Sequence, residues 1–262
     1  MISVTLEQLY GWIAAFLWPL ARILALLGTA PLFGEGSVPT RVKLGLGVLL
    51  TVMIAPTLGP LPDVAPASFA GLGIIAQQVL IGVCLGVCMR MTFAAVQTAG
   101  EVIGLQMGLS FATFFDPGAN ANTTVLSRFL NMITVLVFLA LNGHLMLLAA
   151  LAHTFEVLPI SDGRLSADGL GVLVEWSAQV LVLGLVMALP LVTALLTMNL
   201  SMGILNRTAP QLSVFAVGFP LSLMAGLVML TIVVPQTAPF LERLFSSGFE
   251  SLGRIVDGLA PG

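Results

Sequence analysis

The chain has 262 residues, of which 58% are hydrophobic and 8% are charged, and its mean hydropathy is +1.09. A soluble domain carries charge on roughly a quarter of its residues, so 9 basic and 12 acidic side chains cannot cover a surface of this size in water. The composition excludes a soluble monomer, a disordered chain and a nucleic-acid binder that depends on a basic surface, and it indicates an integral membrane protein.

Six apolar stretches follow one another along the chain, at about 9–30, 42–59, 67–89, 129–152, 170–200 and 212–240. Helices are expected, because an open strand edge leaves backbone groups without partners in lipid. A span of hydrocarbon takes about 20 helical residues, so the second stretch is marginal and the last two are long. The sequence therefore predicts an all-α integral membrane protein with about six long apolar helical segments, arranged as broken or kinked helical hairpins.

The N-terminal stretch is expected to stay on the mature chain as a membrane segment. It has no basic region before its apolar run, it carries Glu7, and Arg22 interrupts the run, which is untypical of a signal peptide. Farther along, Cys84 and Cys88 lie four residues apart in an apolar run, without other metal-ligating residues nearby. They are predicted to be small apolar core residues.

Three glycines spaced by four, Gly100, Gly104 and Gly108, predict a helix face without side chains, where a neighbouring helix can approach closely. Gln97 and Glu101 lie beside this ridge. Because a carboxylate is costly in lipid, Glu101 is expected to face protein or water. Small residues at this spacing are also common in membrane helices, so the spacing alone is a weak signal.

A short, bulky apolar loop is predicted directly after this helix. Its residues are Gln106, Met107, Gly108, Leu109, Ser110, Phe111, Ala112, Thr113, Phe114, Phe115, Asp116 and Pro117. Non-helical backbone in the hydrocarbon is tolerated only where protein buries it or a cavity receives it. The loop is therefore expected to be enclosed by other subunits or to fill a pore as a hydrophobic constriction. An ordinary packed re-entrant loop is the alternative.

The last third of the chain predicts a helical hairpin. Pro190, Pro220 and Pro235 are expected to interrupt or kink its helices. A short polar turn joins the two helices, with Asn206, Arg207, Pro210 and Gln211 at the tip of the hairpin. The tail from Glu242 has apolar residues at helical spacing and is expected to form a surface or interfacial helix.

Polar and ionisable residues in or beside apolar segments are candidates for buried, functional positions. They are Arg22, Arg90, Gln97, Glu101, Arg128, Glu175 and Arg207. They leave open a proton-coupled small-molecule transporter as the alternative function, although no inverted repeat pairs two broken helices. The loops carry too small an excess of Lys and Arg on either side to set the orientation.

The sequence gives little support to enzymatic chemistry. Ser110 lacks the second glycine of a G-x-S-x-G elbow, and His144 and His153 have no evident orienting partner. No ATP-binding motif, metal-ligand cluster or cofactor motif is recognisable. We therefore expect a protein that is not an enzyme, with no catalytic residues, no metal and no cofactor.

Three stretches carry a resemblance to a known family. They are Pro31-Leu32-Phe33-Gly34 with Val38-Pro39 and Arg41, then Gly104 to Ala112 followed by Asp116-Pro117, and finally Met198 to Pro220. In these motifs, and over essentially its whole length, the chain resembles the FliR family of flagellar type III export-gate proteins.

The resemblance implies a non-enzymatic subunit of a helical gate that also contains FliP and FliQ and associates with FlhB. Such a gate passes unfolded flagellar subunits and belongs to the flagellar basal body in the bacterial inner membrane, partly raised towards the periplasm. Residues 1–165 are then similar to FliP, and 166–262 to a FliQ hairpin with an amphipathic tail. The family's pore plug maps onto residues 106–122. Membrane lipid is a further expected partner, and nucleic acid is not.

Overall fold

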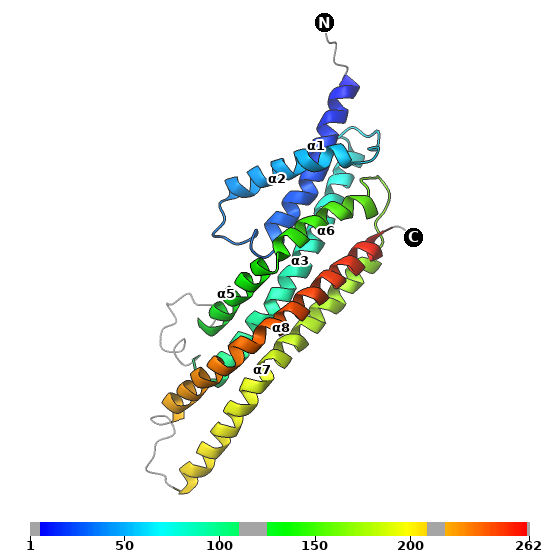
Figure 1. Cartoon of the computed structure of the whole chain (residues 1–262). Coiled ribbons are helices and arrows are strands. Elements are labelled where there is room, and N and C mark those ends of the chain that lie inside the picture. Colours follow the sequence, from blue (N-terminus) through cyan, green and yellow to red (C-terminus); the bar gives the residue numbers. More distant parts are fainter. Residues whose placement is uncertain (1–5, 110–124, 209–217, 261–262) are drawn as a thin grey trace. The chain divides into compact units, whose positions relative to one another are not determined.

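The structure, a computed structural model, describes residues 6–109, 125–208 and 218–260 and is helical throughout these ranges apart from short connections (Figure 1). The elements are α1 (Leu6–Thr29), α2 (Thr40–Ile54), the 3-10 turn η1 (Ala55–Thr57), α3 (Phe69–Gln106), α5 (Val125–Ala140), α6 (Gly143–Val157), α7 (Asp168–Thr208) and α8 (Phe219–Leu259). The predicted all-α fold is confirmed.

Among the described residues, five helices are long and apolar enough to cross a membrane: α1, α2 with η1, α3, α7 and α8. The bent pair formed by α5 and α6 brings the number to six if the pair counts as one broken span. About six apolar segments were expected, and this is what the helices give. The third segment is longer than predicted, because α3 continues past Arg90, whose side chain is exposed, to Gln106.

The long helices α7 and α8 have 41 residues each. The expected interruption at Pro190 is absent, and α7 continues through this residue. A proline removes a single backbone donor, and membrane helices tolerate this loss. Pro220 lies in the first turn of α8, where a proline fits because the backbone N–H has no helical partner anyway.

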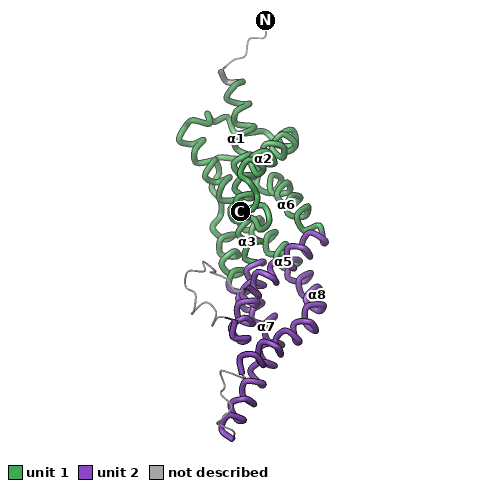
Figure 2. The backbone as a smooth tube through the Cα atoms, turned by 90° about the vertical axis from the view of Figure 1, so that its left-hand side faces the viewer, with its two compact units in different colours: residues 1–91, 142–177, 246–262 green, residues 92–141, 178–245 purple. Residues whose placement is uncertain are grey.

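The chain divides into two compact units (Figure 2). Unit 1 comprises residues 1–91, 142–177 and 246–262, and unit 2 comprises residues 92–141 and 178–245. Helices α3, α7 and α8 each contribute one part to unit 1 and another to unit 2. The predicted division into a FliP-like part and a FliQ-like part stays a prediction.

Unit 1 is held together by close contact between α1 and α3. Gly82 and Gly86 of α3 lie against the backbone and small side chains of α1: a Cβ at Gly82 would collide with the carbonyl oxygen of Arg22, and one at Gly86 with the hydroxyl of Thr29. Large apolar side chains of the same helices, among them Trp18 and Ile81, are almost completely buried. The two glycines are therefore the residues that let α1 and α3 come this close.

The C-terminal end of α8 is also part of unit 1. Leu252, Ile255 and Leu259 are buried, and the carbonyl oxygen of Leu259 accepts a hydrogen bond of 3.1 Å from the backbone N–H of Ser166. The amphipathic tail predicted from Glu242 is thus a continuation of α8, and its apolar side packs against the chain itself.

Unit 2 has an aromatic centre. Phe93 of α3, Phe138 of α5 and Phe245 of α8 lie with ring centroids 5.1–5.5 Å apart. Gly184 of α7 approaches α3 closely, since a Cβ there would lie 2.6 Å from the carbonyl oxygen of Ala95. Parts of four helices therefore meet around this point.

Candidate functional site

The end of α3 is closed by a glycine. Gly108 has a φ of 80°, the left-handed region that glycine adopts without a steric penalty. The N–H of Gly108 donates to the carbonyl oxygen of Leu105 at 3.0 Å, and that of Leu109 donates to Gly104 at 3.0 Å. This pair of bonds is a Schellman motif, which ends a helix and fixes the direction in which the chain leaves it. Gly108 therefore terminates α3, and the predicted glycine ridge is helical only at Gly100 and Gly104.

Met107 fastens this helix end to the body of unit 2. Its side chain is 1% exposed, and it fills the space beside Gly226 of α8, where a Cβ would lie 2.6 Å from Met107 Cγ. Ser222 of α8 also lies close, with its hydroxyl 3.5 Å from the carbonyl oxygen of Met107. The beginning of the predicted loop is thus a packed anchor.

An apolar groove of about 710 Å³ begins at this anchor. Among the described residues that line it, only Thr231 has a polar side chain. The groove is lined by Met107, Leu109, Val125, Leu126, Phe129, Leu223, Leu227, Leu230, Thr231, Val234 and Pro235. Leu109 and Val125, the described residues on either side of positions 110–124, both line the groove.

Of the predicted loop, the structure describes the first four residues. Gln106 is the last residue of α3 and is half-buried, as are Gly108 and Leu109. The predicted plug residues Ser110, Phe111, Ala112, Thr113, Phe114, Phe115, Asp116 and Pro117 lie outside the described residues. Their role stays a prediction.

The glycine ridge meets α5 at Gly100. A Cβ at this position would lie 2.5 Å from the Cα atom of Ser127. At the same contact, the Ser127 hydroxyl donates to the carbonyl oxygen of Gln97 at 3.0 Å, and Gln97 Nε2 donates to Asn131 Oδ1 at 3.1 Å. The sequence singled out Gln97 but missed Ser127 and Asn131. Their four-residue spacing, which places both on one helix face in an apolar stretch, was the available signal.

The structure separates the predicted charged candidates by burial. Arg22 is completely buried, whereas Arg90, Arg128 and Arg207 are exposed on this chain and Glu101 is half-buried. Glu175 is exposed and pairs with Arg254 at 3.4 Å. The described part of the chain therefore buries only Arg22 completely among these candidates.

At the predicted hairpin tip, Asn206 and Arg207 form the last turn of α7. Pro210 and Gln211 lie outside the described residues. A cation in the last turn of a helix is favourable, because the helix dipole is negative there. The structure thus describes only the α7 side of this turn.

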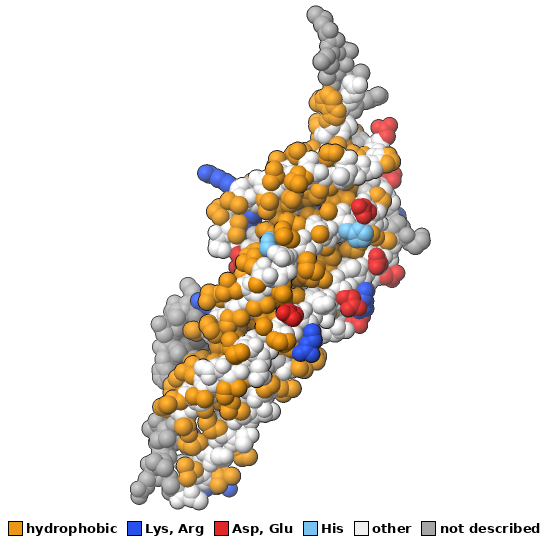
Figure 3. Space-filling view, viewed as in Figure 1, with side chains coloured by type: hydrophobic (Ala, Val, Ile, Leu, Met, Phe, Trp, Pro, Cys, Tyr) orange, Lys and Arg blue, Asp and Glu red, His pale blue; other side chains and the backbone are white. Residues whose placement is uncertain are grey.

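A long apolar face is exposed on α7. Its large exposed side chains are Leu170, Val174, Leu181, Val182, Leu185, Val186, Leu189, Leu196, Leu200, Ile204 and Leu205. Within unit 2, from Leu181 to Leu205, this face extends about 36 Å, at 1.5 Å per helical residue. Apolar side chains also dominate the face of the molecule seen in Figure 3.

The described residues offer no arrangement for metal chemistry, since no three His, Cys, Asp or Glu side chains among them could hold an ion. His153, which the sequence considered as a catalytic partner, lies at the surface and pairs with Glu156 at 2.9 Å. The neighbouring candidate His144 has a buried Nδ1 without a hydrogen-bond partner in the described part of the chain. What the site offers is an anchored helix end, an apolar groove and a long apolar surface.

Comparison with known proteins agrees with this picture. The model of a family described as "Bacterial export proteins, family 1" matches residues 13–248. The chain is 49% identical over 259 residues to the flagellar biosynthetic protein FliR of Escherichia coli K12, covering 99% of each chain. It is 46% identical to the protein of the same name from Pectobacterium carotovorum, again covering 99% of each. The corresponding protein of Bacillus subtilis is 29% identical and is covered over 94% of its length.

Proposed function

The chain belongs to the FliR family of flagellar biosynthetic proteins, and from this premise we propose that it is a subunit of a hetero-oligomeric gate through which unfolded flagellar subunits leave the cytoplasm. Proteins of this family are non-enzymatic membrane components of flagellar protein export. The proposal concerns the gate itself: the chain contributes to its channel and works only together with other helical subunits.

The exposed apolar surface of unit 2 is the observation that carries this proposal. Its part on α7 is about 36 Å long, longer than about 30 Å of hydrocarbon, and an apolar groove of about 710 Å³ lies on the same unit. Apolar surface that lipid does not cover costs about 25 cal/mol per Å² in water. Neighbouring protein subunits are the natural cover for the remainder.

We assign the sealing of the channel to the loop that follows α3. Its support is the anchored helix end: Gly108 fixes the exit direction of the chain, and Met107 is packed against α8. The loop carries Phe111, Phe114 and Phe115 within five residues, which suits a hydrophobic constriction that substrate displaces. The proposed partners are FliP, FliQ and FlhB, with the gate in the inner membrane at the flagellar basal body.

Intact-complex mass spectrometry after mild detergent extraction tests the proposal. The full chain, purified through an affinity tag from cells that make the flagellar apparatus, should carry several much smaller membrane proteins in fixed ratio. A chain recovered alone, or as a small homo-oligomer that transports a small solute with protons, would contradict the proposal and support the proton-coupled transporter.

The sealing role has its own test. Deletion of 111–115 in the assembled gate should raise ion conductance across a planar bilayer, because the constriction is removed while the anchor at Met107 remains. A matched deletion of five residues at 58–62, in the connection before α3, should leave the conductance low. An equal leak in both variants, or in neither, would contradict the assignment of the loop as the seal.

A further inference from the structure

Arg22 occupies an exceptional position in unit 1. It is the only charged side chain that is completely buried in the described part of the chain, with an exposure of 0%. Burial of a charge is costly unless each of its donors finds a partner. The residues around its guanidinium group therefore show how this cost is offset.

The partners of Arg22 come from two other helices and are all uncharged. Nε donates to Gln78 Oε1 of α3 at 2.8 Å. Nη1 donates to both oxygens of Thr154, at 2.9 and 3.0 Å, and Nη2 to the carbonyl oxygen of Leu158 at 2.8 Å. The guanidinium also lies 4.1 Å from the ring centroid of Phe155, a favourable cation–π distance. No carboxylate pairs with it among the described residues.

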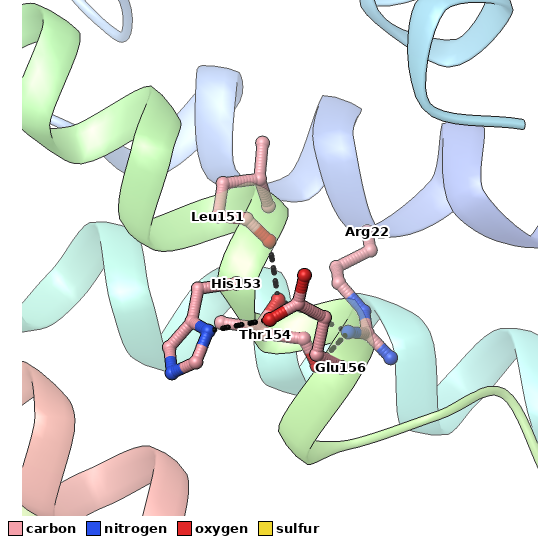
Figure 4. Close-up of polar contacts among 5 residues, drawn as sticks. All are labelled: Arg22, Leu151, His153, Thr154 and Glu156. Atoms are coloured by element: carbon pink, nitrogen blue, oxygen red, sulfur yellow. Dashed lines mark hydrogen bonds and ion pairs between the residues drawn. The ribbon is translucent and has the colours of Figure 1, made fainter. Parts of the chain in front are cut away.

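Two of these partners, the carbonyl oxygens of Thr154 and Leu158, lie at the C-terminal end of α6. Figure 4 draws the contact of Arg22 with Thr154. The last carbonyl groups of a helix lack intrahelical donors and carry the negative end of its dipole. The last turn of α6 contains no basic residue of its own. The carbonyl oxygen of Thr154 already accepts the N–H of Leu158 at 2.9 Å. Arg22, from 132 to 136 residues earlier in the chain, adds a cation at this helix end, a second donor to Thr154 and a donor to the carbonyl oxygen of Leu158.

The fork of the guanidinium matches this arrangement in a way that an ammonium group cannot. Its three nitrogens donate in three directions within one plane, towards α3 on one side and the end of α6 on the other. In addition, the backbone of α1 at Arg22 lies directly on Gly82. Both the main chain and the side chain of this residue are therefore fixed by α3.

We propose that Arg22, Gln78 and the C-terminal end of α6 form a buried clamp that makes the folding of α1, α3 and α6 conditional on one another. Until all three helices are in place, the guanidinium is either exposed or buried without its acceptors. Arginine is required at position 22 because the clamp needs the fork as well as the charge. The clamp thus selects one packing of unit 1, at the expense of a charge that an apolar residue would not have to bury.

Matched substitutions in the full-length, detergent-solubilised chain test the requirement for arginine. Arg22→Lys should lower the ratio of folded to unfolded protein roughly tenfold or more, since at least one hydrogen bond to a charged group is lost. Gln78→Leu should act similarly by leaving Nε–H without its acceptor. The same changes at exposed sites, Arg90→Lys on α3 and Gln236→Leu on α8, should be close to neutral. A folded ratio for Arg22→Lys equal to the unsubstituted chain would overturn the proposal.

A double-mutant cycle tests whether the residues act together. Arg22→Met combined with Gln78→Leu removes donor and acceptor at once, so the double variant should be less impaired than the product of the two single losses. Effects that simply multiply would contradict a clamp. If Arg22→Met yields no folded protein, the same comparison is made between Gln78→Leu and Thr154→Val, each of which removes only one acceptor.

The conditional folding has a separate readout in the native thiols. Cys84 of α3 is buried, near the contact between α1 and α3, and it reacts with a maleimide only when this packing opens. Thr154→Val on α6 should raise the labelling rate roughly tenfold through the lost acceptor, whereas Thr154→Ser, which keeps the hydroxyl, should not. An unchanged rate in Thr154→Val would show that α1 and α3 pack independently of α6.

Discussion

Unit 1 and unit 2 differ in how their least favourable groups, a buried charge in unit 1 and an apolar groove in unit 2, are covered. Unit 1 contains the partners for its most demanding group, Arg22, and closes around it with α3 and α6. Unit 2 has a packed aromatic centre but leaves an apolar groove of about 710 Å³ open. It also includes most of the exposed apolar face of α7. Both units expose large apolar side chains. They differ in that the buried charge of unit 1 finds its partners within the chain, whereas no described residue fills the groove of unit 2.

The largest expected effect comes from filling the close contact in unit 1. Gly82→Leu places side-chain atoms against the backbone of α1, which cannot move without disturbing Arg22. We expect a loss of about 3 kcal/mol or more in the free energy of unfolding, at or above the upper end for overpacking. Thermal unfolding of the detergent-solubilised chain measures it. Gly73→Leu, on the same helix with no atom within 4 Å, is the control, and equal losses in both would show that the contact is not what matters.

A smaller effect, on assembly, is expected from the open face of α7. Leu196 is 49% exposed and its neighbour Leu195 is 1% exposed. Leu196→Ser should leave the stability of the isolated chain nearly unchanged but lower the recovery of its complex several-fold. Leu195→Ser should instead destabilise the chain itself, by about 2–5 kcal/mol if it behaves like other large-to-small core changes. Normal complex recovery with Leu196→Ser, measured on native gels, would place this residue against lipid.

The contact between α8 and Met107 in unit 2 should respond more mildly to the same kind of change as Gly82. The three atoms nearest to a Cβ at Gly226 all belong to the flexible side chain of Met107, which can adopt another rotamer when Gly226→Leu is introduced. We expect a loss of about 1–2 kcal/mol in stability together with a change in gate conductance, because Met107 anchors the loop. Gly203→Leu, which has open space around it, should alter neither. A conductance equal to that of the unsubstituted gate would show that the anchor does not influence the seal.

The smallest effect is expected at the joint between α5 and α6. Asn142 has a φ of 56°, a conformation that asparagine and glycine tolerate better than other residues. Asn142→Ala should therefore destabilise the chain by about 1 kcal/mol, and Asn142→Gly by a few tenths at most. Thermal unfolding of the two variants compares them directly. Equal stability of both would contradict a backbone cause.

The sequence predicted the helices well where apolar runs are bounded by turn residues, and less well where they are not. The end of α3 was recognisable from Gly108, but its continuation past Arg90 was missed, because a charge that faces outward does not end a helix. Likewise, a proline suggested a break at Pro190, whereas the helix accommodates the loss of one hydrogen bond. Local sequence signals predict the type of secondary-structure element, whereas its length depends on the tertiary packing around it.

The glycines of α3 likewise show that sequence spacing does not predict which residues make close helix contacts. Gly100 was identified from its spacing, and it does meet α5, but Gly82 and Gly86 have the same spacing and were overlooked. Nothing in the local sequence distinguishes these glycines from Gly73, which touches nothing. Which face of α3 meets α1 depends on residues about 55 to 60 positions away in the chain.

By itself, the sequence determined the class of this protein, because a charge content of 8% and 27 glycines restrict a chain of this length to close-packed helices in a membrane. It also determined the family, because the motifs around Gly108 and Arg207 are specific to that family. Only the tertiary structure decided which charge is buried. Arg22 lies inside an apolar segment and Arg90 directly after one, but the end of α6 reaches the first, and the second stays exposed. The physical reason is that a buried guanidinium needs acceptors from several helices at once, and these acceptors become neighbours only when the chain has folded.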